Sequence, residues 1–180
     1  MKRRSHSAFA LIVLISSLLL SACGFDLRGS TDDFKLPFRT VYVNVSDNSL
    51  FATTVKRLIR SAGAEVVSDP KKAEARLEIL QRKKEREVLS LTAAGRPREY
   101  ALFYTFNYQV SNRENQVLLG PLEIRFRRTL TYNESQAYAK EKEAELLYTD
   151  MENNAIVQVI RRIASIEVDR SDSDSVEPPL

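Results

Sequence analysis

The 180-residue sequence has few of the side chains on which most enzymes depend: one histidine, one cysteine and no tryptophan. His6 lies near the amino terminus, and Cys23 follows a long apolar run. If the segment before Cys23 is removed and the thiol is modified, no histidine and no free thiol remain. This excludes histidine bases, Ser–His and Cys–His nucleophiles, and metal sites built from His or Cys. Carboxylates and Ser–Lys pairs remain, but no motif arranges them as in a hydrolase, so we predict a non-enzyme without a cofactor.

The sequence also lacks a strong charge of either sign. Its 27 basic and 24 acidic residues give a formal net charge of +3. Lys2, Arg3 and Arg4 lie at the amino terminus, and without them the two signs balance. Such a balanced chain, with no Gly-rich phosphate loop, carries no signature of nucleic-acid binding.

The amino terminus has the layout of an export signal. A cationic start precedes an apolar run from Ala8 to Leu20 that only two serines interrupt. The run has about 13 residues, fewer than the about 20 that a membrane-spanning helix needs. We therefore predict that residues 1–22 are a signal peptide.

The end of this signal, Leu20-Ser21-Ala22-Cys23, resembles the bacterial lipobox. There the thiol receives a diacylglycerol, the chain is cut before the cysteine, and the new amino group is acylated. Two or more acyl chains anchor a protein stably, whereas one anchors it only marginally. Cys23 is thus the predicted lipidation site, carrying covalent N-acyl and S-diacylglycerol groups. The alternative is an ordinary signal peptide with a cysteine near its cleavage site.

Composition divides the rest of the chain into three parts. Residues 23–39 contain small, polar and proline residues and are predicted to be the lipidated amino terminus and a tether. Residues 40–168 have the periodic patterns of a single α+β domain. Residues 169–180 are acidic and almost free of apolar side chains, so a disordered acidic tail is expected.

The first half of the domain predicts strand, helix and strand. Residues 40–45 are β-branched and aromatic. Residues 49–62 have apolar positions at helical spacing between the capping candidates Asp47-Asn48-Ser49 and Gly63. We expect this stripe to pack on a sheet, a partner-binding stripe being the alternative. Residues 65–67 could extend a short strand, and residues 75–91 read as a longer one.

The second half predicts two further strands and a long helix. Residues 98–110 alternate strictly, residues 117–132 do so around a break at Gly120-Pro121, and a capping box at 133–136 begins a helix that ends near Ser165. The expected fold is α+β, with two helices on one face of a four-stranded mixed or antiparallel sheet in the order β-α-β-β-β-α. The predicted core-facing side chains of the last two strands are Tyr100, Leu102, Tyr104, Phe106, Tyr108, Val110, Leu122, Ile124, Phe126, Leu130 and Tyr132, with Arg128 as an exception.

Residues 81–87 interrupt this pattern because they are polar on both faces of the expected strand. Two interpretations remain open. The segment is a solvated edge whose charges discourage aggregation, or a basic surface that meets a partner or an anionic lipid headgroup. The uncovered face of the sheet, polar except for Phe103, suggests docking into a larger structure.

The start Cys23-Gly24-Phe25-Asp26-Leu27-Arg28-Gly29 resembles that of the LptE family, the lipopolysaccharide-assembly lipoproteins of Gram-negative outer membranes. The order of elements and Arg98-Glu99-Tyr100 after a Gly-containing turn are similar too. The resemblance implies a protein held by the Cys23 lipids in the inner leaflet of the outer membrane, on the periplasmic side. It further implies that the protein plugs the LptD β-barrel, helps it assemble, and helps deliver lipopolysaccharide to the outer leaflet.

The resemblance also implies contact with lipopolysaccharide through basic residues near a strand turn. Arginine suits the phosphates of lipid A, and the candidates are Arg96, Arg98, Arg125, Arg127 and Arg128. The family's turn often has its basic residue just before the glycine, whereas this chain has Ala93-Ala94 there and Arg96 after it. The alternative function is an independent periplasmic lipid-binding or shuttle lipoprotein, which needs an apolar cavity between helices and sheet.

Overall fold

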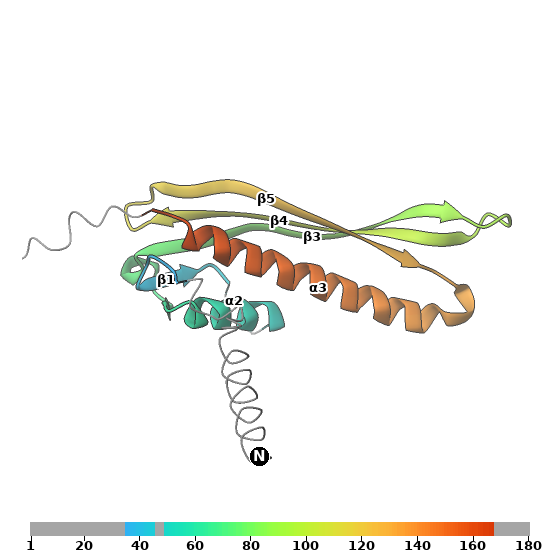
Figure 1. Ribbon diagram of the computed structural model, residues 1–180, viewed down its shortest axis with the longest axis horizontal. Helices are drawn as coiled ribbons and strands as arrows, with labels where there is room; N and C mark the ends of the chain where they lie inside the picture. Colours follow the sequence, from blue (N-terminus) through green and yellow to red (C-terminus); the bar gives the residue numbers. More distant parts are fainter. Residues whose placement is uncertain (1–34, 46–48, 168–180) are drawn as a thin grey trace, which may run out of the picture. The chain divides into compact units, whose positions relative to one another are not determined.

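The computed structural model describes residues 35–45 and 49–167. The predicted signal peptide, Cys23 and the acidic tail lie outside these residues. The described part is an α+β domain with two α-helices on one face of a mixed sheet, as expected (Figure 1). The sheet has five strands in the order β2-β1-β3-β4-β5, so the predicted number of four is wrong.

The strands are β1 (Thr40–Val43), β2 (Glu65–Val67), β3 (Ala75–Leu91), β4 (Pro97–Asn112) and β5 (Val117–Thr131). β1 pairs in parallel with β2 and β3, and β3, β4 and β5 form an antiparallel meander. The additional strand is β2. Its three residues match three of β1, which is enough to add a strand to the edge of the sheet.

The first helix, α2, spans Leu50–Ser61 within the predicted range. Ser49 begins it, because its side-chain oxygen accepts a hydrogen bond from the Ala52 N–H at 3.2 Å. Phe51, Val55 and Ile59 repeat at helical spacing and are buried. The backbone reverses at Gly63, whose φ of +84° suits glycine. The apolar stripe of α2 therefore packs in the core of the domain.

The second helix, α3, spans Ala137–Ala164 and follows a short 3-10 helix, η3 (Glu134–Gln136). Asn133 accepts from the Ser135 N–H at 3.1 Å, so the predicted capping residue caps η3 rather than α3. α3 runs along β4 and β5 (Figure 1). Within the described residues, neither helix combines the length and hydropathy that a bilayer crossing requires.

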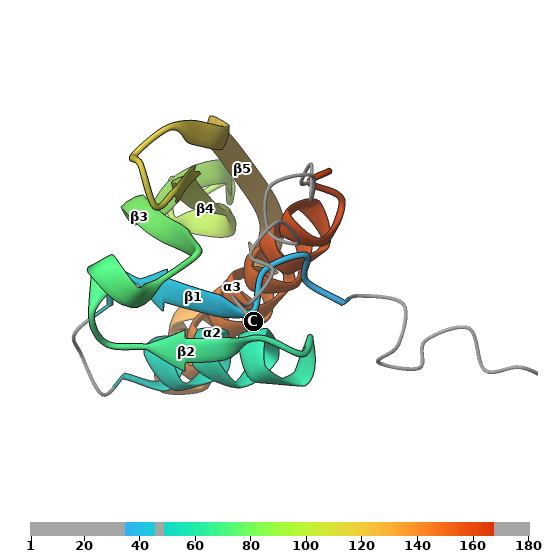
Figure 2. The same ribbon diagram turned by 90° about the vertical axis from the view of Figure 1, so that its left-hand side faces the viewer.

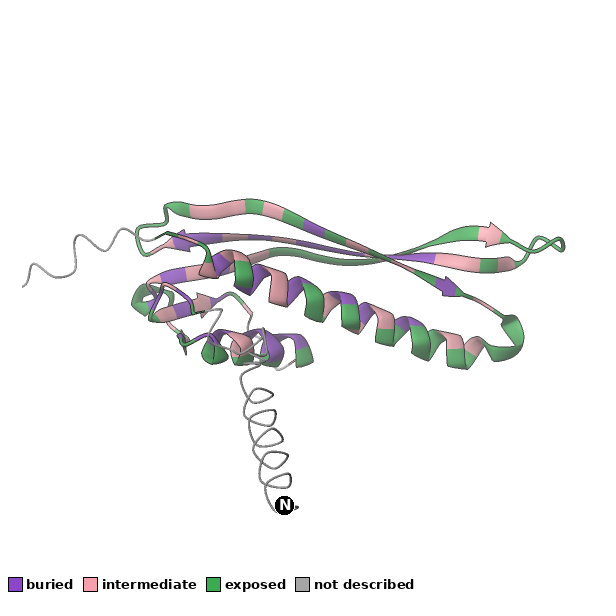
Figure 3. Cartoon of the chain, viewed as in Figure 1, coloured by how far each residue is buried: buried purple, intermediate pink, exposed green. Residues whose placement is uncertain are grey.

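The core lies between the helices and the sheet (Figure 3). It contains the six predicted side chains of β4, of which Tyr100 is partly buried, together with side chains of α2 and α3. Leu36 and Phe38 also lie in this core, although residues 23–39 were expected to be a tether. Burial of apolar side chains stabilises the fold, and these two draw the end of the predicted tether into the domain.

β1, β2 and α2 gather at one end of the domain (Figure 2). β1 pairs with the edge of β3 only from Ala75 to Leu77. The side chain of Asn44 continues this pairing for one further residue, since it accepts from the Ile79 N–H at 2.8 Å and donates to the Ile79 carbonyl at 3.2 Å. Beyond Ile79, no described strand pairs with that side of β3. Residues 81–87 therefore lie on a sheet edge, as the first interpretation expected.

Candidate functional site

The face of the sheet opposite the helices, called here the open face, is covered by polar side chains that bond to one another. The Asn107 amide donates to Gln81 Oε1 at 3.1 Å, and the Gln109 amide donates to the carboxylate of Glu78. Both bonds join β4 to β3. The open face thus satisfies part of its own hydrogen-bonding capacity without a covering layer.

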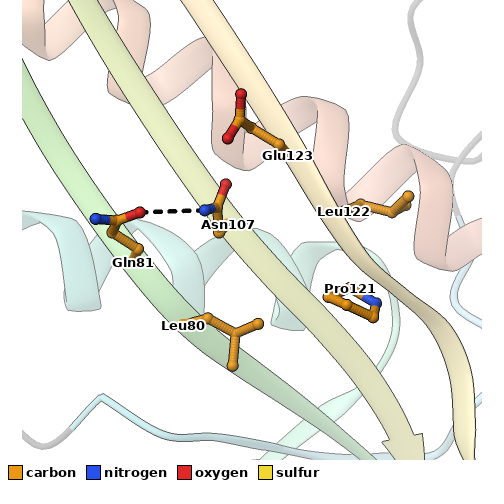
Figure 4. A pocket seen from close by; sticks show the side chains of 6 residues that line it. All are labelled: Leu80, Gln81, Asn107, Pro121, Leu122 and Glu123. Atoms are coloured by element: carbon orange, nitrogen blue, oxygen red, sulfur yellow. Dashed lines mark hydrogen bonds between the residues drawn. The ribbon is translucent and has the colours of Figure 1, made fainter.

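A shallow hollow of about 410 Å³ lies on this face (Figure 4). Its lining mixes apolar and polar side chains from three strands: Leu80, Gln81, Asn107, Pro121, Leu122 and Glu123. The bulge between Ile79 and Gln81 leaves Leu80 half exposed at its rim. Asn107 Oδ1 is buried and has no hydrogen-bond partner among the described residues. No three His, Cys, Asp or Glu side chains gather as metal ligands in the described ranges.

A cationic cluster lies farther along the open face. The guanidinium carbons of Arg125 and Arg127 lie 4.6 and 5.9 Å from the ring centroid of Phe103. Their register explains this, because Arg127 pairs with Phe103 and Arg125 with Thr105. Cations within about 6 Å of an aromatic face are attracted by the ring. Two of the five predicted arginines therefore share one site, around an aromatic side chain.

β3 adds a third cation and one anion to this cluster. Lys83 Nζ lies 2.8 Å from Glu85 Oε1, and these residues pair with Thr105 and Phe103 of β4. The hydrogen bond from Lys83 lowers the pKa of Glu85, and the field of Arg125 acts in the same direction. We call Lys83, Glu85, Phe103, Arg125 and Arg127 the open-face cluster, which has three cations and one anion.

Arg128 faces the other way. It pairs with Leu102, whose side chain is on the helix-covered face, and its guanidinium lies 3.1 Å from Asp150 Oδ2 on α3. The predicted exception in the core-facing register is thus confirmed. The ion pair compensates the charge of Arg128 at the margin of the core. Arg128 therefore lies on the face opposite to Arg125 and Arg127.

Arg96 and Arg98 lie at the far end of the β3–β4 hairpin. Arg96 bonds to Glu134 Oε2 at 2.7 Å, which joins the turn to η3. The Arg98 side chain is exposed and has no partner among the described side chains. Arg98 is seven residues along β4 from Thr105, the partner of Arg125, which corresponds to about 23 Å. The five arginines therefore occupy three separate places.

Sequence reasoning missed a row of cations on the helix side of β3. The Arg82 guanidinium lies 3.9 Å from the Phe51 ring centroid and Lys84 Nζ lies 5.5 Å from that of Tyr148. Arg86 makes two hydrogen bonds to Glu141, at 2.7 and 2.9 Å. These cations occupy every second position, a spacing that places them on one face of a strand. This alternation of cations was the sequence signal from which the row could have been predicted.

Hydroxyl and carboxylate groups of α3 complete this contact with the β3 edge. The Tyr148 hydroxyl donates to the Glu85 carbonyl at 2.6 Å, and burial raises the pKa of Tyr148. The hydrogen bond with Glu141 raises the pKa of Arg86, and the same bond lowers the pKa of Glu141. Since the row is bonded to α3, it is less available to a ligand than the open-face cluster.

The space between the helices and the sheet is filled where the alternative function needs a cavity. Leu102, Tyr104 and Phe106 are at most 1% exposed. Phe106 contacts the Phe51 ring, with 6.0 Å between centroids. The Tyr104 hydroxyl donates to Glu152 Oε2 at 3.2 Å, and burial raises the pKa of Tyr104. These side chains form a packed core rather than the walls of a lipid site.

Comparisons with known proteins agree on one family. The chain is 26% identical to the LPS-assembly lipoprotein LptE of Pectobacterium atrosepticum over 163 residues, which cover 89% of this chain and 87% of that protein. It is 24% identical to LptE of Yersinia enterocolitica, over 88% of this chain and 76% of that protein.

Two solved structures have the same fold. The solution structure of lipoprotein B from Nitrosomonas europaea superposes with a TM-score of 0.65 at 34% identity, covering 78% of this chain and 90% of that one. The rare lipoprotein B from Shewanella oneidensis superposes with a TM-score of 0.61 at 25% identity, covering 70% and 94%. The family profile described as "LptE: Lipopolysaccharide-assembly" matches residues 38–163, and the chain therefore belongs to the LptE lipopolysaccharide-assembly family.

Proposed function

We propose that this protein is an outer-membrane lipoprotein that fills the lumen of an LptD β-barrel, supports the folding of that barrel, and helps deliver lipopolysaccharide to the outer leaflet. Acylated Cys23 holds it to the inner leaflet on the periplasmic side. Membership of the lipopolysaccharide-assembly family supports the biological role. The observation that supports a position inside a barrel is the open face, which is polar, bonded to itself and uncovered by the described helices.

The physical argument concerns water. The lumenal walls of large membrane barrels are polar and wet. A sheet face rich in apolar side chains needs a dry covering layer, whereas one that carries Gln81, Asn107 and Gln109 in hydrogen bonds does not. The open face is therefore suited to a wall that it meets through water and hydrogen bonds.

Contact with lipopolysaccharide is the finer part of the proposal. Arginine binds phosphate through two parallel hydrogen bonds, which makes it the better partner for the phosphates of lipid A. Arg125 and Arg127 present such groups beside Phe103, and Arg98 presents another at the hairpin end. Arg96 and Arg128 already bind Glu134 and Asp150, so their contribution requires exchange of an exposed ion pair.

The independent lipid shuttle is the weaker proposal. It needs an apolar cavity under the helices, and Leu102, Tyr104 and Phe106 fill that position. The hollow on the open face has polar side chains from Gln81, Asn107 and Glu123 in its lining, which does not suit an acyl chain.

The barrel proposal is tested by purification from detergent-solubilised outer membrane. We expect the unaltered protein to copurify with a large barrel, and its depletion to lower the amount of folded barrel and of surface lipopolysaccharide. Thr129→Trp places a large ring on an exposed position of the open face and should weaken copurification. The matched control is Leu146→Trp on α3, where the side chain is 72% exposed. A normally folded, abundant barrel after depletion would refute the proposal.

A further inference from the structure

The two helices differ in how their charges are arranged. α3 carries acidic and basic residues together, and Lys140 and Lys142 bind Glu143 and Glu145 at 2.8 and 2.9 Å. α2 contains no acidic residue. Its three cations, Lys56, Arg57 and Arg60, have no side-chain partner among the described residues. The charged side chains of α2 are therefore all cations, and no other described side chain of the domain neutralises them.

These cations share one side of α2. Positions 53, 56, 57 and 60 are three and four residues apart, so they form one face of the helix. Phe51, Val55 and Ile59 define the buried face, and Thr53, Arg57 and Arg60 are exposed. Leu50 lies near the same outer face at the start of the helix and is 73% exposed. The outer face of α2 thus combines unpaired cations with an exposed leucine.

This combination is typical of a helix that lies on an anionic lipid surface. Lys and Arg bind the headgroups while an aliphatic side chain enters the interface. In Figure 1, α2 lies on the side of the domain away from β4 and β5, and no described element is drawn beyond it on that side. An acidic protein wall is the alternative occupant of this face, and quenching in protein-free lipid vesicles distinguishes the two.

The length of the chain before the domain allows this contact. Leu36 donates its N–H to the carbonyl of Ala62, so the described chain begins beside the end of α2. About 12 residues separate Cys23 from Lys35, and they span at most about 40 Å when fully extended. A domain held by acylated Cys23 therefore stays within reach of the bilayer surface. This step depends on the proposed acylation, whereas the charge of α2 does not.

We infer that the outer face of α2 docks on anionic phospholipid and acts as a second, electrostatic anchor beside the acyl chains. Each cation near an anionic surface contributes about fivefold to binding. Docking fixes the orientation of the domain relative to the membrane, which acyl chains on a tether do not do. The contact is with phospholipid, on a surface distinct from the open-face cluster.

The test uses the acylated protein as purified, reconstituted in vesicles. Thr53→Cys supplies a thiol for an environment-sensitive dye, since Cys23 is the chain's only other cysteine. Leu146→Cys on α3 is the matched control site. We expect nitroxide-headgroup lipid to quench the dye at position 53, but not at 146, when about a third of the phosphatidylcholine is replaced by phosphatidylglycerol. High salt should reverse the quenching.

Two double variants with the same change in charge test whether the cations of α2 cause the quenching at position 53. Arg57→Glu with Arg60→Glu should lower the ratio of docked to undocked helix by at least about 25-fold. Lys140→Glu with Lys142→Glu on α3 should leave it within about twofold. Equal quenching in neutral vesicles, equal loss in both variants, or no quenching at position 53 would overturn the inference, whether or not the protein binds a barrel.

Discussion

The two faces of β4 show how one strand serves two environments. Its even-numbered positions from Leu102 to Val110 lie under the helices and are at most 1% exposed. Its odd-numbered positions bear polar or cation-contacted side chains, among them Phe103, Asn107 and Gln109. One face is stabilised by apolar burial and the other by hydrogen bonds and cation–π contacts. An uncovered sheet face can therefore be stable in water if its side chains bond to one another.

The largest loss of stability should follow from a substitution on the helix-covered face of β4. Phe106→Ala removes a fully buried ring that contacts Phe51 and Tyr108. We expect a loss of about 3–5 kcal/mol in the free energy of unfolding. Chemical denaturation followed by circular dichroism measures it. A loss similar to that of an exposed substitution would contradict the described core.

A second prediction tests what keeps the two faces distinct. A register slip of one residue between β4 and β5 would exchange their faces. Gly120 has φ of +98°, and a Cβ there would lie 2.9 Å from the Tyr108 carbonyl oxygen. Gly120→Ala should therefore cost about 1–3 kcal/mol through strain. Gly95→Ala, with a positive φ but no atom within 4 Å of the added Cβ, is the control and should cost less.

Substitutions on the open face should lower the free energy of unfolding less than those in the core. Phe103→Ala removes the ring that both Arg125 and Arg127 contact but opens no buried cavity. We expect a loss of about 1 kcal/mol, together with weaker binding of lipopolysaccharide in a pull-down. Phe103→Leu keeps apolar bulk without the ring and separates the two causes. A loss as large as that of Phe106→Ala would mean that the open face is covered in solution.

The smallest effect concerns pH. Since the pKa of Glu141 is lowered in the folded protein, its bond to Arg86 stabilises the fold above the carboxyl's unfolded value of about 4.3. This stabilisation is lost as the pH falls through the lowered folded pKa. The pair is exposed, so it contributes less than about 1 kcal/mol. Glu141→Gln should remove that part of the pH dependence, measured by denaturation between neutral and acid pH, and leave neutral stability nearly unchanged.

Much of this comparison was predictable from the sequence, because strict alternation fixes which side chains share a face of a strand. The faces of β4 follow from it. The bounds of β3 were predicted from its two alternating ends, although its middle is polar on both faces. β2 was not counted because its three residues form a strand only by pairing with β1, a contact far along the chain. The burial of Leu36 and Phe38 likewise depends on helix and sheet packing that no local pattern contains.

The candidate site was predictable in part. Alternation placed Arg125 and Arg127 on one face and Arg128 on the other, and the structure agrees. The contacts of Arg82 and Arg86 with aromatic rings were missed because a charged side chain gives no sign that its stem packs against a neighbour. The distances between the arginines could not be predicted, because they depend on the register of the strands.

The proposed function requires that the open face meets the inner wall of a barrel. Site-specific photocrosslinking in intact cells tests it most directly, with the reactive side chain at Thr129 on the open face and, for comparison, at Met151 in the core. We expect a crosslink from Thr129 to a large outer-membrane barrel and none from Met151. Thr129 remaining uncrosslinked while the protein is abundant and folded would contradict it.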